Sequence, residues 1–476
     1  MLIKPANLRD WIDFDSKAAR DHVIETINVI EVLIREIASS FTARTKKNNR
    51  ESEVITMSNP MTTLYVGIDV SKNSNVVCCL NFEGKKLYSG SFKNNQDESL
   101  MLQSKLLETK TNNSFDAIEI VLESTGVYSF HIGLFLSSSE PLNSANTTVY
   151  VVNPKMTNNY AKSYIDMTKS DPSDSFMLAD FARCGRTKLL TPFRGKQRLA
   201  LQRLTRYRKH LVDLLCQEKM YVLNNIFLKF SEFNNSSHDF KTFANTFSTT
   251  SIELLTNYYS PETIASTSID KLANSLSKYS KNKFKDPKAV AMKLQSAARA
   301  SYRLDKVMYE PINSCIASSF CLIRAYEKQI KDIEVQINSL IKGLDNQNEY
   351  KSLMSIPGIG PVYASGILSE IGSIEDFQSD DALANFAGLT RKKTQSGNFD
   401  ASDTPMQKNG NSYLRYYLIE ATQNVISNIS SYKEYFDKKK SEVTNHAFAR
   451  ARVLTARKVL RLIYSLTSQN KLYTPK

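Results

Sequence analysis

Hydrophobic positions are grouped in two different ways along the chain, and the change separates an α/β part from a helical part. Short β-branched runs predict five strands, at residues 64–70, 76–80, 86–92, 117–122 and 147–152. Helical patterns near 96–108 and 127–137 lie between them, and Glu83-Gly84 is a turn between the second and third runs. This order suits a ribonuclease-H-like sheet, although on pattern alone any α/β domain would fit almost as well.

Beyond residue 190 the apolar positions recur at helical spacing. Residues 195–230 predict one long helix with apolar positions spaced 3, 4 and 3, namely Leu204, Tyr207, Leu211 and Leu214. Residues 302–344 predict a second, with spacing 3, 4, 3, 4 at Ile330, Ile333, Ile337, Leu340 and Leu344. The segment 231–283 between them is rich in Ser, Thr and Asn and predicts loops and short helices. Two such helices separated by an insertion indicate an antiparallel coiled-coil arm.

The first sixty residues contain a separate helical pattern. Residues 15–42 carry a heptad-like apolar stripe, formed by Val23, Ile27, Ile30, Ile34, Ile37 and Phe41. A basic linker, Lys46 to Arg50, follows. We interpret the segment as an appended interaction helix; the alternative is an over-extended reading frame that truly starts at Met57 or Met61. The predicted organisation is therefore an extension (1–60), an α/β domain (61–190), an arm with a polar insertion (191–350) and a C-terminal domain (351–476).

The net charge points to a polyanionic partner, and nucleic acid is the first choice. The chain of 476 residues has 62 Lys and Arg against 48 Asp and Glu, a formal charge of +14. Residues 191–230 hold nine basic residues against two acidic ones, and residues 431–476 hold eleven against three. Arg203, Arg206 and Lys209 recur every third residue on one flank of the first long helix, which predicts a nucleic-acid contact.

Several classes of protein are disfavoured by what the sequence lacks. It has no uninterrupted apolar run near 18 residues and no secretory pattern at its start, so we expect a cytoplasmic, nucleoid-associated protein without a membrane span. The six cysteines form no Cys-x-x-Cys, and we expect reduced thiols: Cys78, Cys79, Cys184, Cys216, Cys315 and Cys321. Five histidines without His-Glu-x-x-His and fifteen glycines without a phosphate-loop motif leave carboxylates and hydroxyls as the chemical groups.

Four carboxylates form the first candidate site. Asp69 and Glu123 end the first and fourth predicted strands, which are adjacent in a ribonuclease-H-like sheet. Asp171 and Asp174 are three residues apart and share one face of a helix. Converging carboxylates repel one another unless a hard cation neutralises them, and oxygen ligands suit Mg²⁺, which activates phosphodiester chemistry. The alternatives are a turn residue, a solvated rim residue and a helix start in which Asp171 is the N-cap, Pro172 is N1 and Asp174 is N3.

Two glycine-containing motifs in the C-terminal part predict phosphate contacts. Gly358 and Gly360 lie in Ile-Pro-Gly-Ile-Gly-Pro, where backbone N–H groups can approach a phosphate as in a helix-hairpin-helix; a plain tight turn is the alternative. A cationic loop surrounds Ser396-Gly397, with basic residues at Arg391, Lys392, Lys393, Lys408 and Arg415. A serine there could attack phosphorus if a metal or base activates it. The alternative is a DNA-binding loop with a bystander serine.

These motifs together resemble a known family, the DEDD transposases. They are the recombinases of the one-hundred-and-ten family of bacterial insertion sequences, including its eleven-eleven subgroup. The N-terminal resemblance lies in Gly67-Ile68-Asp69-Val70-Ser71-Lys72, Glu123-Ser124-Thr125-Gly126, Asn153-Pro154 and Lys169-Ser170-Asp171-x-x-Asp174. The C-terminal resemblance lies in Ile356 to Pro361, Phe386-Ala387-Gly388-Leu389, Gln395-Ser396-Gly397 and Lys408-x-Gly410-Asn411-x-x-Leu414-Arg415. It runs from about 63 to 465 in the same order and with similar spacing.

The resemblance implies a RuvC-like domain of ribonuclease-H fold, a coiled-coil arm and a mostly helical C-terminal transposase domain. It implies that Asp69, Glu123, Asp171 and Asp174 hold Mg²⁺ and that Ser396 is the nucleophile of a phosphoserine intermediate. It also implies donor and target DNA, a structured non-coding guide RNA (the bridge RNA), and a tetramer built as a dimer of dimers, with sites shared between protomers.

The sequence departs from the family pattern in places. The loop after Ser396-Gly397 lacks the expected further glycine and reads Asn398 to Pro405, which makes Ser402 a second candidate nucleophile. Three rival functions remain. A junction-resolving nuclease would use the same carboxylates without Ser396. An actin-like ATPase or sugar kinase would share the fold. A non-catalytic nucleic-acid binder would need neither the carboxylates nor Ser396.

Overall fold

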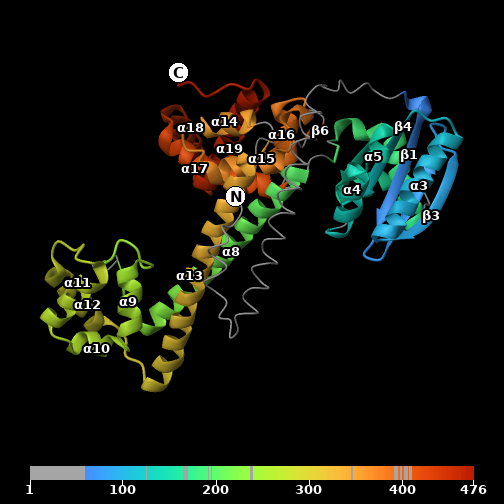
Figure 1. The fold of residues 1–476 in the computed structure, drawn as a ribbon. Coiled ribbons are helices and arrows are strands. Elements are labelled where there is room, and N and C mark those ends of the chain that lie inside the picture. Colours follow the sequence, from blue (N-terminus) through green and yellow to red (C-terminus); the bar gives the residue numbers. More distant parts are fainter. Residues whose placement is uncertain are drawn as a thin grey trace, which may run out of the picture. The chain divides into compact units, whose positions relative to one another are not determined.

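The computed structural model describes most of the chain after residue 58, and it divides into two compact units at Arg194 and Gly195 (Figure 1). The described residues are 59–124, 126–164, 170–190, 192–193, 196–235, 240–344, 347–390, 395–396, 399–400, 406 and 410–475. The predicted helix at 15–42 and its linker lie outside them. No helix in these ranges is long and apolar enough to cross a membrane.

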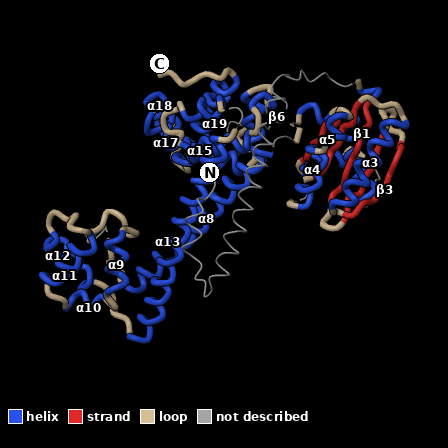
Figure 2. The backbone as a smooth tube through the Cα atoms, viewed as in Figure 1, coloured by secondary structure: helices blue, strands red, loops and turns tan. Residues whose placement is uncertain are grey.

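The first unit is built on a five-stranded sheet of order β3-β2-β1-β4-β5 (Figure 2, red). Strands β1 (Thr63–Val70), β2 (Ser74–Leu80) and β3 (Lys86–Lys93) are antiparallel. Strands β4 (Ala117–Glu123) and β5 (Thr147–Val152) run parallel to β1. All five predicted strands are present, and their order confirms the RuvC-like, ribonuclease-H-type sheet.

Helices cover both faces of this sheet because β1 alternates its side chains between two cores. Leu64, Val66 and Ile68 pack beneath α3 (Gln96–Asn112) and α4 (Tyr128–Ser138). Tyr65 on the other face packs against α7 (Asp171–Arg183), whose buried residues include Leu178, Ala179 and Ala182. Two shorter helices, α5 (Glu140–Ser144) and α6 (Pro154–Ala161), flank β5 in the sequence. The helix α7 therefore lies on the opposite face from α3 and α4.

Two long helices of the second unit lie side by side and run in opposite directions (Figure 1). They are α8 (Lys196–Lys229) and α13 (Lys306–Lys342). Buried isoleucines spaced by seven residues form the inner row of α13: Ile316, Ile323, Ile330 and Ile337. Lys219 pairs with Glu327 and Arg208 pairs with Glu334, so falling numbers on α8 meet rising numbers on α13. The predicted antiparallel arm is present.

The polar insertion between these helices folds into a compact helical body. It contains α9 (Thr249–Asn257), α10 (Pro261–Ser266), α11 (Ile269–Ser280) and α12 (Pro287–Ala300). Their apolar side chains share one core with the far end of the arm. Three of the serines in this segment are N-cap residues at helix starts, namely Ser248, Ser260 and Ser268. The prediction of short helices is confirmed.

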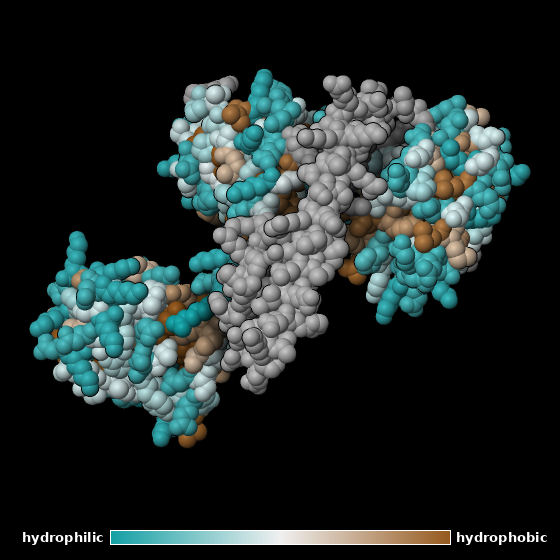
Figure 3. Space-filling view, in the orientation of Figure 1, coloured by the Kyte–Doolittle hydropathy of each residue, from teal (hydrophilic) through white to brown (hydrophobic). Residues whose placement is uncertain are grey.

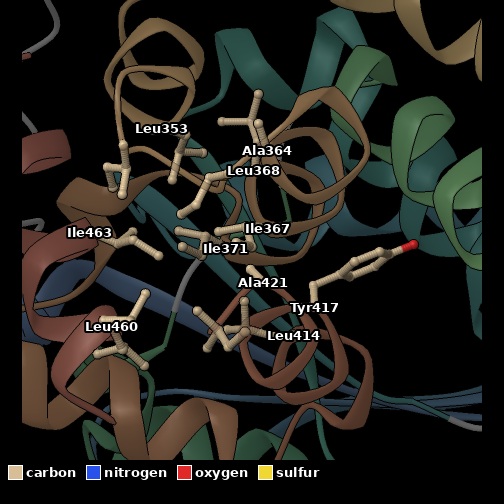
Figure 4. Packing of buried hydrophobic residues seen from close by; sticks show 14 of the residues in the cluster. Leu353, Ala364, Ile367, Leu368, Ile371, Leu414, Tyr417, Ala421, Leu460 and Ile463 are labelled. Atoms are coloured by element: carbon tan, nitrogen blue, oxygen red, sulfur yellow. The ribbon is translucent and has the colours of Figure 1, made fainter. Parts of the chain in front are cut away.

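Six helices form the rest of the second unit around a large apolar core (Figure 4). They are α14 (Asn348–Met354), α15 (Pro361–Ile371), α16 (Asp380–Ala387), α17 (Ser412–Asn428), α18 (Ser430–Ser441) and α19 (Ala447–Ser468). A two-stranded hairpin, β6 (Gln395–Ser396) and β7 (Phe399–Asp400), lies between α16 and α17 in the sequence. The mostly helical C-terminal part is thus confirmed, and its visible surface is largely hydrophilic (Figure 3, teal).

Candidate functional site

The sheet brings the first two candidate carboxylates to neighbouring strand ends. Asp69 is the penultimate residue of β1, and Glu123 is the last residue of β4. The two strands are parallel neighbours in which Ile68 lies opposite Leu122, so Asp69 and Glu123 are the next residues along the same register. The hydroxyl of Thr157, a buried residue of α6, donates to Oε2 of Glu123 at 3.1 Å. The strand order therefore positions this pair.

The helix α7 brings the other two carboxylates to the same place, because Gly67 lets it lie directly on β1. A Cβ at Gly67 would stand 2.1 Å from the carbonyl oxygen of Ser175 and 2.3 Å from the amide nitrogen of Ala179. Asp69 is two residues further along the strand, so it points to the same face as Gly67. Asp171 and Asp174 occupy the first turn of α7, as the spacing predicted.

The other three carboxylates act electrostatically on Asp69. Burial and the negative charges of Asp174, Asp171 and Glu123, in that order, raise the pKa of Asp69 to about 6. Within the described ranges, no three Asp, Glu, His or Cys side chains are close enough to hold a metal ion as they stand. The carboxylates are thus near enough to repel one another but are not gathered into a ligand shell. This excess of negative charge and an oxygen-only donor set fit a hard divalent cation such as Mg²⁺.

The start of α7 corrects one alternative drawn from the sequence. Ser170, not Asp171, is the N-cap, and its side chain forms a capping box with Ser173. Asp171 is therefore N1 and Asp174 is N4. The alternative drawn from the sequence made Asp171 the N-cap and Asp174 N3, so each lies one position further into the helix than that alternative gave. The sequence misassigned the cap because Ser and Asp are nearly equivalent N-cap residues, and Pro172 is tolerated anywhere in the first turn.

The predicted nucleophile lies in the second unit. Ser396 ends β6, and its backbone pairs with that of Phe399. Five of the residues predicted beside it, including the second candidate nucleophile, lie outside the described residues: Arg391, Lys392, Lys393, Ser402 and Lys408. Ser396 lies in a segment that leaves α16 at Gly388 and returns to α17 at Gly410, and we call this segment the excursion. Its two ends, which we call its base, are described by the structure.

The two ends of this excursion are held together by backbone contacts. Gly410, at φ +116°, packs so tightly that a Cβ would lie 2.4 Å from the carbonyl oxygen of Phe386. The amide of Asn411 donates to that same oxygen at 2.7 Å. The guanidinium of Arg415 donates to the carbonyl oxygen of Ala387 at 3.0 Å. The motif Gly410-Asn411-x-x-Leu414-Arg415 therefore closes the base of the serine segment.

A buried carboxylate that the sequence reasoning missed fixes this closure. The side chain of Glu370 on α15 is fully buried and accepts hydrogen bonds from Asn411 at 2.7 Å and from Arg206 at 2.7 and 2.8 Å. Gln202 donates to it at 3.2 Å. Asn411 in turn caps α17 by accepting the amides of Tyr413 and Leu414. A lone acidic residue in an otherwise uncharged helix was the signal in the sequence.

The predicted nucleic-acid contacts on α8 have other partners in this structure. Arg206 pairs with Glu370, and its guanidinium lies 4.5 Å from the centre of the Tyr413 ring. Lys209 pairs with Asp213 at 2.6 Å and lies 4.7 Å from the Tyr416 ring. Arg203 is exposed on the same helix. Contact of these three residues with nucleic acid stays a prediction.

The glycine-rich turn joins α14 to α15 as predicted, but its two glycines differ. Gly358 has a φ of +98°, and a Cβ there would lie 2.6 Å from the backbone of Asn424 and Val425 in α17. Tight packing therefore explains Gly358 without a ligand. Gly360 is the N-cap of α15 and has open space around it, where a phosphate could approach the helix start. Phosphate binding at this turn stays a prediction.

Comparisons with known proteins match both halves of the chain. Residues 66–229 match the model of the IS110 DEDD transposases, and residues 350–437 match the model described as "Transposase IS116/IS110/IS902 family". A 44.8 kDa uncharacterized protein of insertion element IS116 from Streptomyces clavuligerus is 22% identical over 423 residues, 87% of this chain and 96% of that protein. The transposase for insertion sequence element IS1111A from Coxiella burnetii is 26% identical over 151 residues, 31% of this chain and 40% of that protein.

Among solved structures, a chain described as "T. thermophilus RuvC in complex with Holliday junction substrate" aligns over 28% of this chain and 99% of its own length. Its identity is 13% and its TM-score 0.21, so the RuvC-like fold rests on the strand order instead. The first family model spans all four carboxylates, and the second spans the serine segment with its closed base. The chain belongs to the IS110/IS116/IS1111 family of DEDD transposases.

Proposed function

We propose that this transposase cuts and rejoins the DNA of an insertion sequence through a phosphoserine link at Ser396, with Mg²⁺ held by Asp69, Glu123, Asp171 and Asp174. One observation supports the metal site: burial, together with the negative charges of three neighbouring carboxylates, raises the pKa of Asp69 to about 6. Carboxylates kept this close, on a rigid strand pair and a helix start, need a cation to work together.

The residues of the chain divide the chemistry between them. The strand ends fix Asp69 and Glu123, and the first turn of α7 fixes Asp171 and Asp174. Bound Mg²⁺ would stabilise the negative charge that develops around phosphorus. The Oγ of Ser396 forms a bond to phosphorus while the bond to the departing deoxyribose oxygen breaks, and that oxygen leaves with a proton. A second attack by a DNA hydroxyl reverses these roles and releases the serine.

The partners follow from the same proposal. Donor and target DNA supply the phosphodiester bonds, and a structured guide RNA from the element itself would select the target. We propose a tetramer of two dimers, in which the carboxylates of one protomer act with the serine of another. The net charge of +14 supports polyanionic partners, and contacts with phosphate make both associations weaker at high salt.

A second function is favoured because all four proposed metal-binding carboxylates come from the first unit. A junction nuclease would use the same four carboxylates and water, with no covalent intermediate. All four residues lie between β1 and α7, and none comes from the second unit. The two functions differ in whether a protein–DNA adduct forms.

The deciding experiment is recombination in cells between a donor and a target plasmid, with the gene and its flanking non-coding DNA supplied. The comparison is wild type, Asp69→Asn, Ser396→Ala and Ser402→Ala. We expect Asp69→Asn and Ser396→Ala to reduce the recombination product by at least about 10³-fold, and Ser402→Ala to leave the amount of product unchanged. Denatured protein should carry covalent DNA in wild type and Ser402→Ala only.

The outcomes separate the two functions. Loss of activity in Asp69→Asn together with full activity and no adduct in Ser396→Ala would support the nuclease and exclude Ser396 as nucleophile. Loss of both the recombination activity and the covalent adduct in Ser402→Ala would identify Ser402, rather than Ser396, as the nucleophile.

A further inference from the structure

The arm formed by α8 and α13 has two flanks, one on each side of the seam between the helices. The seam is marked on α13 by Ile316, Ile323, Ile330 and Ile337. Lys219 and Glu327 each come four residues after an inward residue, Leu215 and Ile323, and they form an ion pair at 2.8 Å. In an antiparallel helix pair, residues four positions after an inward residue lie on one flank of the seam. Residues one position before an inward residue lie on the opposite flank.

The flank with the ion pair is covered by other parts of the second unit. At one end, the hydroxyl of Thr205 bonds that of Ser369 at 2.9 Å, and the carbonyl oxygen of Thr205 accepts from the hydroxyl of Tyr417. At the other end, Ile226 on α8 and Phe320 on α13 enter the core of the helical insertion. This side of the arm is therefore part of the folded body.

The opposite flank exposes an apolar row to solvent. On α8 it consists of residues spaced by seven: Tyr207, Leu214, Tyr221 and Leu228. Three of them are about half exposed, at 49%, 52% and 54% for Tyr207, Tyr221 and Leu228. Leu322 lies on the α13 side of the same flank and is 43% exposed. We call this surface the bare flank.

Between Tyr207 and Leu228, the α8 side of the bare flank has no basic residue, and Glu218 is the charged residue beside it. The residues between the apolar ones on that row are His210, Gln217 and Asn224. A surface that binds nucleic acid needs Lys or Arg against the phosphates, and this row has neither. On α13 the neighbouring positions Ser318 and Ala325 are small and exposed, so another helix could approach closely. The composition suits a protein helix with an apolar stripe.

We propose that residues 15–42 form that helix and pack along the bare flank as a third strand of the arm. Their stripe of Val23, Ile27, Ile30, Ile34, Ile37 and Phe41 spans 19 residues, about 27 Å of helix. The row from Tyr207 to Leu228 spans 22 residues, about 32 Å. Isoleucine at alternating 3 and 4 spacing favours assemblies of more than two helices.

A second copy of the chain is the competing occupant. Two bare flanks brought together would bury each other but would leave the stripe at 23–41 in water. Packing that stripe on the bare flank removes both apolar rows of one chain from water in a single contact. The proposal does not depend on the phosphoserine chemistry, so either can fail alone.

The test is the reactivity of a thiol placed on the bare flank. Tyr221→Cys is alkylated with iodoacetamide and followed by mass spectrometry, and the exposed native Cys216 is the internal control. The full chain is compared with the chain beginning at Met57 and with full chains that carry Ile30→Asp in the stripe. Asn28→Asp is the matched control, because it adds the same charge off the stripe.

We expect alkylation at position 221 to be at least about tenfold slower in the full chain and in Asn28→Asp than in the shortened chain and Ile30→Asp. Cys216 should react equally in all four. Equal rates at position 221 in all four proteins would overturn the proposal. So would protection that persists in the shortened chain and grows with protein concentration, which would assign the bare flank to a second copy.

Discussion

The carboxylate site and the serine segment are held in place by different kinds of contact. In the first unit, strand pairing and the close approach of α7 to Gly67 fix every carboxylate on a regular element. In the second unit, Ser396 lies on a two-residue strand, and the excursion that carries it is closed by hydrogen bonds around Glu370 and Asn411. The first arrangement should be sensitive to packing and to charge, and the second to loss of a polar partner.

The largest effect is expected where packing alone sets the geometry. Gly67→Ala would place a methyl group 2.1 Å from a backbone carbonyl oxygen of α7, so the helix must move away from β1. We expect the free energy of unfolding of the sheet unit to fall by about 3 kcal/mol or more and recombination to be lost. Calorimetry of the full chain and the cellular assay measure the two effects.

A matched control separates this effect from the general cost of replacing glycine. Gly343→Ala, at the end of α13, has ordinary φ and no atom nearer than 3.5 Å to the added methyl. It should leave both the melting profile and the recombination unchanged. Wild-type activity in Gly67→Ala would show that the position of α7 does not determine the site.

The next effect tests the polar closure of the serine segment. Glu370→Gln removes the charge that Arg206 pairs with and gives Asn411 a weaker acceptor, inside a fully buried position. We expect the second unit to lose about 2–3 kcal/mol of stability. The covalent adduct should fall more than DNA affinity does, because the serine segment loses its anchor.

The control for Glu370 is Glu334 on α13, whose arginine partner also lies on α8. Glu334→Gln breaks the ion pair with Arg208. The Glu334 side chain is 30% exposed, whereas that of Glu370 is fully buried, so the effect on stability should be below about 1 kcal/mol and the adduct yield should be unchanged. Equal losses of adduct in the two variants would assign Glu370 a role in the arm rather than in the serine segment.

A smaller effect concerns the charge of the carboxylate site. The pKa of Asp69 is raised to about 6 from an ordinary 3.8, so the folded state binds the proton more tightly than the unfolded state. Protonation of Asp69 therefore stabilises the folded state fully below pH 4. As the pH rises through 6 this contribution is lost, and the free energy of unfolding falls by about 1–2 kcal/mol after solvent screening. Thermal melts from pH 4 to 8 measure this contribution as the difference between wild type and Asp69→Asn.

Magnesium should reverse that loss. At pH 7.5, millimolar Mg²⁺ should raise the melting temperature of the first unit in wild type and much less in Asp69→Asn, because binding to the folded state stabilises it. A magnesium response of equal size in the two proteins would place the cation elsewhere.

The sequence predicted the sheet, and the places of Asp69 and Glu123 at strand ends, well because both depend on short-range patterns. Alternating apolar runs located all five strands, and the order of elements then placed Asp69 beside Glu123. Glu370 could not be found in this way, because its partners, Arg206 and Asn411, are more than 40 residues away on other helices. The short helices of the polar insertion were predicted, but their common core was not, since it forms only when four short helices pack together.

The smallest effect tests how closely the carboxylate site is tuned. Thr157 is buried, and its hydroxyl bonds Glu123. Thr157→Val keeps the shape but removes the bond, which should cost about 1 kcal/mol of stability and raise the Mg²⁺ concentration for half-maximal activity a few fold. Thr157→Ser keeps the hydroxyl and should restore the magnesium dependence even if it packs less well. If the valine and serine variants shift the magnesium dependence equally, the hydroxyl does not position Glu123, and this carboxylate is held by its strand alone.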